Sequence, residues 1–351
     1  MKILFFLDYI QDVDLLLPLA RKASEKSGWQ VSVCFTDRLY GRFPCAASDF
    51  KSLPVQFRVV ARWKILLGLG LDLEGLDVLV TASESNLRPH WAAHRLTQQA
   101  NRRGIKTYTL QHGFEQAGLT YFDRRNPPGT VCYASQRIFI WGEEATLHPD
   151  TPADVKARCV SVGCPKELRG PGAMQKPEGR PFVVAVFENL HWHRYTNEYR
   201  AQFAADLKET AGRFPEILFS VRPHPDHRWI ERNHAGLFSD VTSLVLNGDG
   251  IRDANAVITT LSTVALDGAM AGLPVAVVAY DLNVSPYRPL FAVRSQDDWC
   301  GFIRSVTGAS GHGEWANASR QFVNRTVIQG DAVEAILRVL RSDCSFMHPS
   351  V

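Results

Sequence analysis

Short apolar runs recur along the chain, and each ends in polar residues. The first run covers residues 3–7 and ends at Asp8, and a second covers residues 31–35. The first run is unbroken, which is typical of a parallel strand that is buried on both faces, and the second is interrupted only by Ser32. The leucines between the two runs have helical spacing, with Asp12 placed to cap the helix and Gly28 to end it. This strand, helix, strand order predicts a doubly wound α/β domain.

The same alternation continues through the first half of the chain. Further apolar runs predict strands at residues 77–81, 106–110, 137–142 and 159–163. A helix is expected at residues 89–103. No GxGxxG pattern follows the first strand, which argues against a dinucleotide-dependent dehydrogenase.

The composition changes abruptly between residues 165 and 181, where glycine, proline and charged residues occur without periodicity. Such a stretch is typical of a linker between domains. Beyond it, apolar runs predict strands at residues 182–187, 216–221, 241–245, 256–258 and 274–278. Helices are expected at residues 197–213 and 331–341.

The predicted architecture is therefore two Rossmann-like α/β lobes. The expected parts are an N-terminal, acceptor-side lobe at residues 1–165, a linker at 166–181, a nucleotide-binding lobe at 182–330, and a C-terminal helix and tail at 331–351. A ligand is expected in the cleft between the lobes, because binding sites occur preferentially at domain interfaces.

Compact polar side chains follow two strands of the second lobe. They are Arg222, His224 and Pro225 after one strand, and Thr260, Ser262 and Thr263 after the other. Ligands of open α/β sheets bind at the carboxyl ends of the strands. Arginine and histidine donate to phosphate, and hydroxyl residues are favoured where a helix begins and an anion can bind. The pattern predicts a nucleotide phosphate held between the two strand ends.

Composition narrows the function only slightly. The chain has 351 residues, 45% of them hydrophobic, and a net charge of +3, which gives no indication of nucleic acid as a partner. The seven cysteines include no CxxC pair, which favours reduced thiols over disulfides or a metal site. No apolar run approaches the ~20 residues of a spanning helix, and the first run is too short for a signal peptide. A cytoplasmic protein, soluble or peripheral to the membrane, is expected.

Residues 55–67 mix cations with aromatic and aliphatic residues. We expect a helix here, and two locations fit it. It can pack on the first lobe, or it can rest on the anionic inner face of the cytoplasmic membrane.

An ordered set of short motifs links the two halves. They are Gln111-His112-Gly113, Trp141-Gly142, Val162-Gly163-Cys164-Pro165-Lys166, Arg222 with His224-Pro225, and Thr259-Thr260-Leu261-Ser262-Thr263. The set resembles GT-B glycosyltransferases that use a cytidine-activated donor. One related group uses CMP-sugars and contains the transferases of 3-deoxy-manno-octulosonic acid (Kdo) and the bacterial sialyltransferases. The other contains the CDP-glycerol glycerophosphotransferases of teichoic acid.

This resemblance implies roles for particular residues. In these families the His-Pro and Ser/Thr motifs contact the nucleotide phosphate, so the matching residues of the second lobe are expected to face the nucleotide. His112 matches the histidine that acts as acceptor base in the glycerophosphotransferases. Acidic residues are implicated in the Kdo transferases that retain configuration, so Glu115 or Glu188 can instead act as nucleophile. The role of each of these three residues and the stereochemical outcome stay open.

The resulting prediction is transfer of an acidic sugar, with Kdo first, from a CMP-sugar to a bacterial glycan or glycolipid acceptor. Phosphotransfer from CDP-glycerol or another CDP-alditol is the first alternative. The second is a UDP-GlcNAc epimerase-like enzyme, because Ser262 to Gly268 with Gly272-Leu273-Pro274 also resembles those enzymes. No Asp-x-Asp cluster of the sequence suggests a divalent ion, so neither a metal nor another cofactor is expected.

Overall fold

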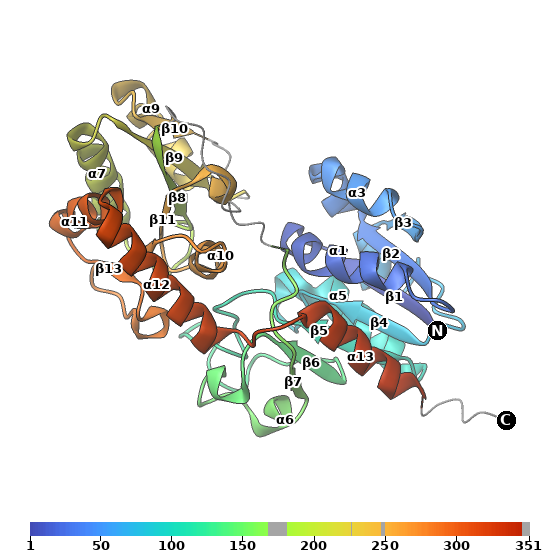
Figure 1. Ribbon diagram of the computed structural model, residues 1–351. Helices are drawn as coiled ribbons and strands as arrows, with labels where there is room; N and C mark the ends of the chain where they lie inside the picture. The colour runs from blue at the N-terminus through green and yellow to red at the C-terminus, as the bar shows by residue number, and fades with distance from the viewer. Residues whose placement is uncertain (168–180, 226, 247–249, 346–351) are drawn as a thin grey trace. The chain divides into compact units, whose positions relative to one another are not determined.

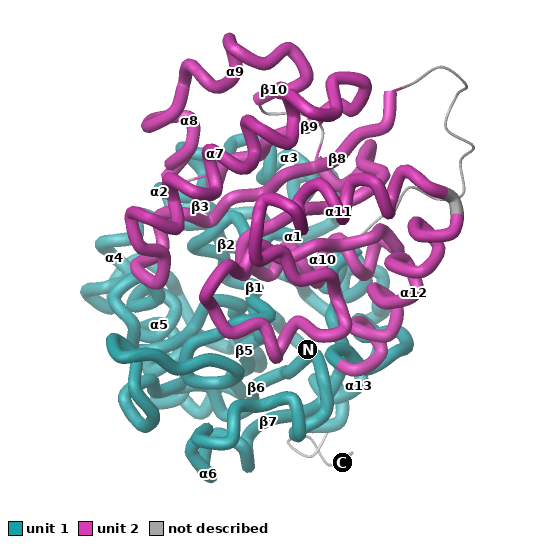
Figure 2. The backbone as a smooth tube through the Cα atoms, turned by 90° about the vertical axis from the view of Figure 1, so that its left-hand side faces the viewer, with its two compact units in different colours: residues 1–167, 326–351 teal, residues 168–325 magenta. Residues whose placement is uncertain are grey.

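The computed structural model describes residues 1–167, 181–225, 227–246 and 250–345, and the chain divides into two compact units. Unit 1 comprises residues 1–167 and 326–351, and unit 2 comprises residues 168–325 (Figure 2). Most of the predicted linker, residues 168–180, lies outside the described residues. Each unit contains one parallel sheet, which confirms the prediction of two Rossmann-like α/β parts.

Unit 1 is built on a seven-stranded sheet in the order β3-β2-β1-β4-β5-β6-β7 (Figure 1). Its strands are β1 Lys2–Leu7, β2 Gln30–Thr36, β3 Gln56–Val60, β4 Val78–Thr81, β5 Lys106–Leu110, β6 Arg137–Ile140 and β7 Cys159–Ser161. All of these pairs are parallel. The order reverses between β1 and β4, which is the switch point where α/β sheets bind ligands.

Short helices connect these strands. They are α1 Ile10–Ser24, α2 Asp37–Arg42, α3 Pro44–Lys51, α4 Arg62–Leu66, α5 Trp91–Arg102 and α6 Ala153–Lys156. Helix α1 begins three residues earlier than the sequence predicts. Tyr9 is its N-cap residue, and Asp12 lies in the first turn.

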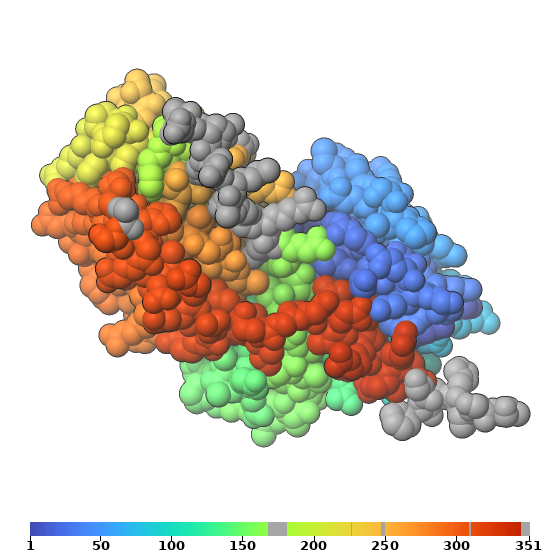
Figure 3. Space-filling view, in the orientation of Figure 1, coloured from blue at the N-terminus to red at the C-terminus, as the bar shows by residue number. Residues whose placement is uncertain are grey.

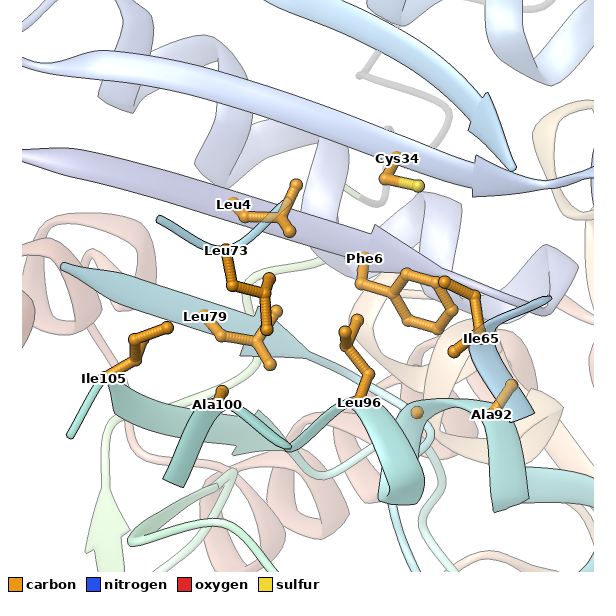
Figure 4. Packing of buried hydrophobic residues seen from close by; sticks show 11 residues of the cluster. Leu4, Phe6, Cys34, Ile65, Leu73, Leu79, Ala92, Leu96, Ala100 and Ile105 are labelled. Atoms are coloured by element: carbon orange, nitrogen blue, oxygen red, sulfur yellow. The ribbon is translucent and has the colours of Figure 1, made fainter. Parts of the chain in front are cut away.

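The core beside α5 follows from the alternation of side chains along β1. Leu4 and Phe6 point to the same face of the sheet, where Leu79 of β4 joins them (Figure 4). Helix α5 covers this face with Ala92 and Leu96, spaced one helical turn apart. The packing explains why residues 91–102 form an amphipathic helix against the sheet.

The C-terminal segment belongs to unit 1. Helix α13 Ala332–Ser345 packs beside α1, and Figure 3 shows it (red) against the N-terminal segment (blue). The Glu334 carboxylate accepts a hydrogen bond from Lys26 Nζ at 2.8 Å, and Asp343 accepts one from the Tyr108 hydroxyl at 2.9 Å. The chain therefore returns to unit 1 after completing unit 2.

Unit 2 is built on a six-stranded sheet in the order β10-β9-β8-β11-β12-β13, and all its pairs are parallel. Its strands are β8 Phe182–Glu188, β9 Ile217–Pro223, β10 Leu244–Leu246, β11 Ala256–Thr259, β12 Val275–Val278 and β13 Phe291–Val293. The helices that begin in it are α7 Asn197–Arg213, α8 Trp229–Asn233, α9 Leu237–Asp240, α10 Val264–Met270, α11 Gln296–Thr307 and α12 Ala309–Thr326. Strand β13 and helices α11 and α12 are additions to the predicted elements.

The expected helix at residues 55–67 is wrong. Residues 56–60 form β3, which pairs with β2, and only residues 62–66 form a helix, α4. The β-branched Val59 and Val60 favour the extended form, and pairing with β2 satisfies their backbone groups. No helix in the described part of the chain is long and apolar enough to cross a membrane.

Candidate functional site

The carboxyl ends of three adjacent strands form the candidate site of unit 2. In the sheet, Glu188 at the end of β8 pairs with Pro223 of β9, and Phe187 pairs with Thr259 of β11. His224 directly follows β9 and Thr260 directly follows β11. The residues predicted to bind nucleotide therefore gather at one edge, on both sides of the switch point between β8 and β11.

The hydroxyl residues at this edge differ in their roles. Thr260 is fully buried, and its Oγ1 accepts a hydrogen bond from the backbone N–H of Asn189 at 3.0 Å. Ser262 Oγ accepts one from the backbone N–H of Val264 at 3.1 Å, where the short helix α10 begins. Thr260 and Ser262 thus hold the loop in place, and Thr263 follows them at the N-cap position of α10.

Arg222 presents an exposed side chain at the end of β9. Its guanidinium packs directly against Gly250: a Cβ added to that glycine would lie 2.5 Å from Arg222 Nη1. Gly250 also has a φ of +73°, a conformation that favours glycine. Because residue 250 has no side chain, the Arg222 guanidinium has room to pack against its backbone.

Glu188 lies at the same edge, but its carboxylate points into the protein. It is 3% exposed and accepts backbone hydrogen bonds from Leu190 at 2.8 Å and Ile230 at 3.4 Å. Burial raises the pKa of its carboxyl group, and the backbone donors oppose that shift. These contacts give Glu188 an anchoring role, and its role as nucleophile stays a prediction.

Two further histidines lie beside His224. The ring centroid of His191 is 4.3 Å from that of His224 and 3.8 Å from that of His227. Neither His191 nor His227 was among the predicted site residues. A sequence signal existed for His227, which lies three positions after His224. None existed for His191, which belongs to a different loop.

His112 is the central candidate in unit 1. Its side chain is partly exposed, but Nδ1 is buried and has no hydrogen-bond partner among the residues described. The ring also makes a hydrogen bond to the backbone of Ala82. Burial lowers the pKa of His112 to about 4, and the charge of Lys166 adds to this shift. The imidazole is therefore neutral at pH 7 and available as a proton acceptor.

The surroundings of His112 are ordered by polar contacts. Its backbone N–H donates to Gln116 Oε1 at 2.8 Å, and its ring meets the edge of His90 at a centroid distance of 5.0 Å. His90 Nδ1 lies 2.7 Å from Ser85 Oγ. Glu115 lies in the same loop with a partly exposed side chain. The structure thus brings His112 together with the ends of β4 and β5.

The switch point of unit 1 holds a charged network that the sequence did not indicate as a site. Arg62 Nε donates to Asp8 Oδ2 at 2.9 Å, and the Asp8 backbone N–H donates to Asp12 Oδ2 at 2.9 Å. Ser83 Oγ donates to Asp12 Oδ1. Burial raises the pKa of Asp12 to about 7. The network holds the ends of β1 and β4 in place. The pKa of the Asp12 carboxyl group lies near neutral pH.

Glu84 has a structural environment. It is fully buried and accepts hydrogen bonds from Ser135 Oγ at 2.8 Å and the Ala134 backbone N–H at 3.0 Å. Its Oε1 also lies 2.5 Å from His94 Nδ1. The carboxylate therefore joins the end of β4 to residues 134–135.

Solved structures of UDP-GlcNAc 2-epimerases and of a glycotransferase are similar to the chain over nearly its whole length. The chain is similar to UDP-GlcNAc 2-epimerase from Neisseria meningitidis bound to UDP-GlcNAc, with a TM-score of 0.70 and 13% identity over 97% of this chain and 100% of that one. It is similar to the Methanocaldococcus jannaschii enzyme in complex with UDP-GlcNAc and UDP, with a TM-score of 0.66 and 14% identity over 97% and 100%. It also resembles the glycotransferase of kitacinnamycin, with a TM-score of 0.61 and 12% identity over 97% and 98%.

These similarities show the GT-B fold, with two Rossmann-like units. No protein-family model matches the sequence, and no curated protein does. The fold prediction is confirmed, while a CMP-linked donor and Kdo transfer receive no support from these structures.

Proposed function

We propose that the chain is an enzyme acting on a nucleotide sugar, with 2-epimerisation of a UDP-N-acetylhexosamine as the first candidate. The observation that carries this proposal is the similarity of the whole chain to the whole of a UDP-GlcNAc 2-epimerase. This choice replaces Kdo transfer as the leading hypothesis.

The chemistry of unit 2 fits the first step. The C2 hydrogen of an intact nucleotide sugar is not adjacent to a carbonyl group, so the nucleotide has to leave C1 before C2 is readily inverted. Negative charge then develops on the departing phosphate, and preorganised donors stabilise it. Arg222 and His224 are the donors at the carboxyl end of β9, and Thr263 follows β11. Pro225 shapes the turn after His224.

Unit 1 supplies a base for the second step. His112 is neutral at pH 7, and its Nδ1 has no partner in the described part of the chain. In epimerisation this nitrogen would accept the C2 proton, which leaves a double bond between C1 and C2. Return of a proton to the opposite face of C2 and of the nucleotide phosphate to C1 would then complete the inversion. Glu115, partly exposed in the same loop, is the second candidate for that role.

Glycosyl transfer is the second candidate function. It shares the departure of the nucleotide but ends with an acceptor hydroxyl bonded to the anomeric carbon, and His112 would act as base for that hydroxyl. The motif Gln111-His112-Gly113 favours it, because this motif carries the resemblance to enzymes with cytidine-activated donors. CMP-linked acidic sugars belong to this candidate. Phosphotransfer from a CDP-alditol is a different reaction, in which the acceptor hydroxyl attacks phosphorus and CMP leaves.

Donor turnover in D2O separates the two functions. We would incubate the protein with UDP-GlcNAc, UDP-ManNAc, CMP-Kdo, CMP-sialic acid or CDP-glycerol and follow each by NMR. Epimerisation predicts a C2-inverted UDP-sugar with deuterium at C2. Release of nucleotide from only a cytidine donor would select the transferase and exclude the epimerase. No reaction of UDP-GlcNAc or UDP-ManNAc contradicts the first candidate.

A surface on unit 1 supports peripheral membrane binding, which belongs to the second candidate function. Trp63, Leu67 and Leu69 are 55%, 68% and 57% exposed, respectively. Beside them, a groove between the end of α4 and the face of α5 is lined by Leu66, Leu67, Gly68, Arg95, Gln98, Gln99, Arg102 and Arg103. Exposed apolar side chains next to arginines are complementary to an anionic bilayer surface. Binding there would serve a lipid-linked acceptor, and hence favours the transferase.

A further inference from the structure

The cluster of His191, His224 and His227 has the composition of a metal site. Each ring can offer one nitrogen, and these three nitrogens lie within 4.8 Å of one another. His191 follows the end of β8 by three residues, and His224 follows β9 directly. The three imidazoles thus meet at the carboxyl edge of adjacent strands.

Backbone contacts build this arrangement. The N–H groups of His227 and Arg228 donate to the carbonyl of His224 at 3.2 and 3.0 Å, which forms a turn between the two ligands. Arg200 donates to the carbonyls of Leu190 at 2.7 Å and Trp192 at 3.2 Å, on either side of His191. Both loops are therefore held by contacts that do not use the imidazoles.

The environment of His191 favours coordination. Its Nδ1 is buried and has no hydrogen-bond partner in the part of the chain described. A buried polar nitrogen without a partner is costly, by about 1–3 kcal/mol. The neutral imidazole is the form of histidine that binds metals, and an unpartnered ring nitrogen is available for coordination.

We propose that His191, His224 and His227 bind one divalent transition-metal ion, with Zn²⁺ as the reference ion. Imidazole nitrogens suit zinc, copper, nickel and iron, whereas magnesium and calcium prefer oxygen ligands. Three histidines leave a fourth position open on a tetrahedral ion, as in catalytic zinc sites. The expectation of no metal considered only Asp-x-Asp clusters, which supply oxygen ligands, so a site of three histidines departs from that expectation.

Binding requires a small rearrangement. The rings of His191 and His227 now stack at an angle of 15°. A tetrahedral ion with Zn–N distances of 2.0–2.1 Å brings its nitrogens to about 3.4 Å from one another. His227 is exposed, so its ring can turn toward the other two without loss of core packing.

The site adds to the proposed function and does not depend on it for metal binding. If the chain acts on a nucleotide sugar, the open position of the ion lies at the edge where the phosphates are proposed to bind. His224 would then act on phosphate through the metal instead of through a direct hydrogen bond. Metal binding without substrate tests the site separately from catalysis.

The test is zinc and cobalt binding to the full chain, purified without a histidine tag. Titration with Zn²⁺ by calorimetry should show one equivalent bound, and Co²⁺ should give the visible absorption of a tetrahedral complex. His227→Ala and His191→Ala should each weaken the binding by at least about tenfold, because even residues that only orient ligands contribute 10–100-fold. His234→Ala, a histidine of unit 2 outside the cluster, should bind as the wild type does.

Two controls complete the experiment. Circular dichroism of each variant confirms that it is folded, and His227→Ala alters an exposed side chain and should leave the fold intact. Cysteine binding would instead give the near-ultraviolet charge-transfer band of a Co²⁺–thiolate complex. The proposal is overturned if the wild type binds no Zn²⁺, if thiolate bands dominate, or if the folded His227→Ala variant keeps full affinity.

Discussion

Side chains at the two strand edges divide into those that hold the protein together and those that are available to a ligand. Thr260 and Glu188 accept backbone hydrogen bonds from neighbouring loops. His112 has a buried Nδ1 without a partner among the described residues, and Arg222 is exposed. The latter two are therefore the first choices for chemistry and for binding.

His112→Ala should lower kcat by about 10²–10⁴-fold, the usual effect of losing an acid–base group. Nucleotide affinity should stay nearly unchanged, because His112 belongs to unit 1 and the proposed nucleotide contacts belong to unit 2. Steady-state kinetics and nucleotide titration measure the two effects. Glu115→Gln tests the second candidate in the same way, and His148→Ala is the control histidine of unit 1. Full activity of both His112→Ala and Glu115→Gln would exclude a base in this loop.

Asp12 should make unit 1 less stable as the pH rises from about 4 to 7. Its pKa is raised from 3.8 to about 7, so in this window the folded protein holds a proton that the unfolded chain has lost. The contribution is at most about 4 kcal/mol. Urea denaturation of the wild type and Asp12→Asn between pH 5 and 8 measures it. An equal slope with pH in both proteins would contradict the raised pKa.

Among the secondary-structure elements, the buried strands were the easiest to predict. Residues 3–7 are a continuous apolar run, and residues 217–221 are interrupted only by the buried Ser220, because both faces of each sheet are covered. Strand β3 was missed because its burial is incomplete: Val59 is 41% exposed, and cations interrupt the run. Strand β13 has only three residues, too few for a pattern.

The site was predictable where it depends on strand ends, and less so where it depends on loops. The positions of Arg222 and His224 follow directly from the end of β9. The sequence could not reveal that the Thr260 hydroxyl accepts a hydrogen bond from the backbone N–H of Asn189, because these two residues are 71 positions apart. His191 was missed for the same reason: its neighbours His224 and His227 come from another loop.

The exposed apolar surface of unit 1 that contains Trp63, Leu67 and Leu69 leads to a prediction about lipid binding. Wild-type protein should sediment with phosphatidylglycerol vesicles and much less with phosphatidylcholine, because arginines adjoin the exposed apolar side chains. The double variant Trp63→Ser/Leu67→Ser should lose most of this binding. Val245→Ser removes an exposed apolar side chain of unit 2 and serves as the matched control. Equal binding of both variants to anionic vesicles would exclude this surface.

For the chain as a whole, the return of residues 326–345 to unit 1 makes that unit depend on both ends of the sequence. The backbone N–H of Ile328 donates to the carbonyl of Trp141 at 2.9 Å. A Cβ at Gly142 would lie 2.5 Å from the carbonyl oxygen of Thr326. The close approach explains why glycine follows Trp141 in the motif.

Gly142→Ala should therefore destabilise the protein by about 1–3 kcal/mol, the usual cost of overpacking. Chemical denaturation measures the change. Gly41→Ala is the control, because a Cβ at this position of α2 meets no atom within 4 Å. Equal stability of Gly142→Ala and wild type would show that the C-terminal segment does not pack on Trp141-Gly142 as described.

The most direct test of the account is calorimetric titration of UDP into the wild type and two unit 2 variants, Arg222→Ala and His224→Ala. We expect each variant to bind UDP roughly ten- to hundredfold more weakly, since hydrogen bonds to charged groups contribute about 1.5–3 kcal/mol. His234→Ala should retain wild-type affinity. The account is contradicted if the wild type does not bind UDP, or if both Arg222→Ala and His224→Ala bind it as tightly as the wild type.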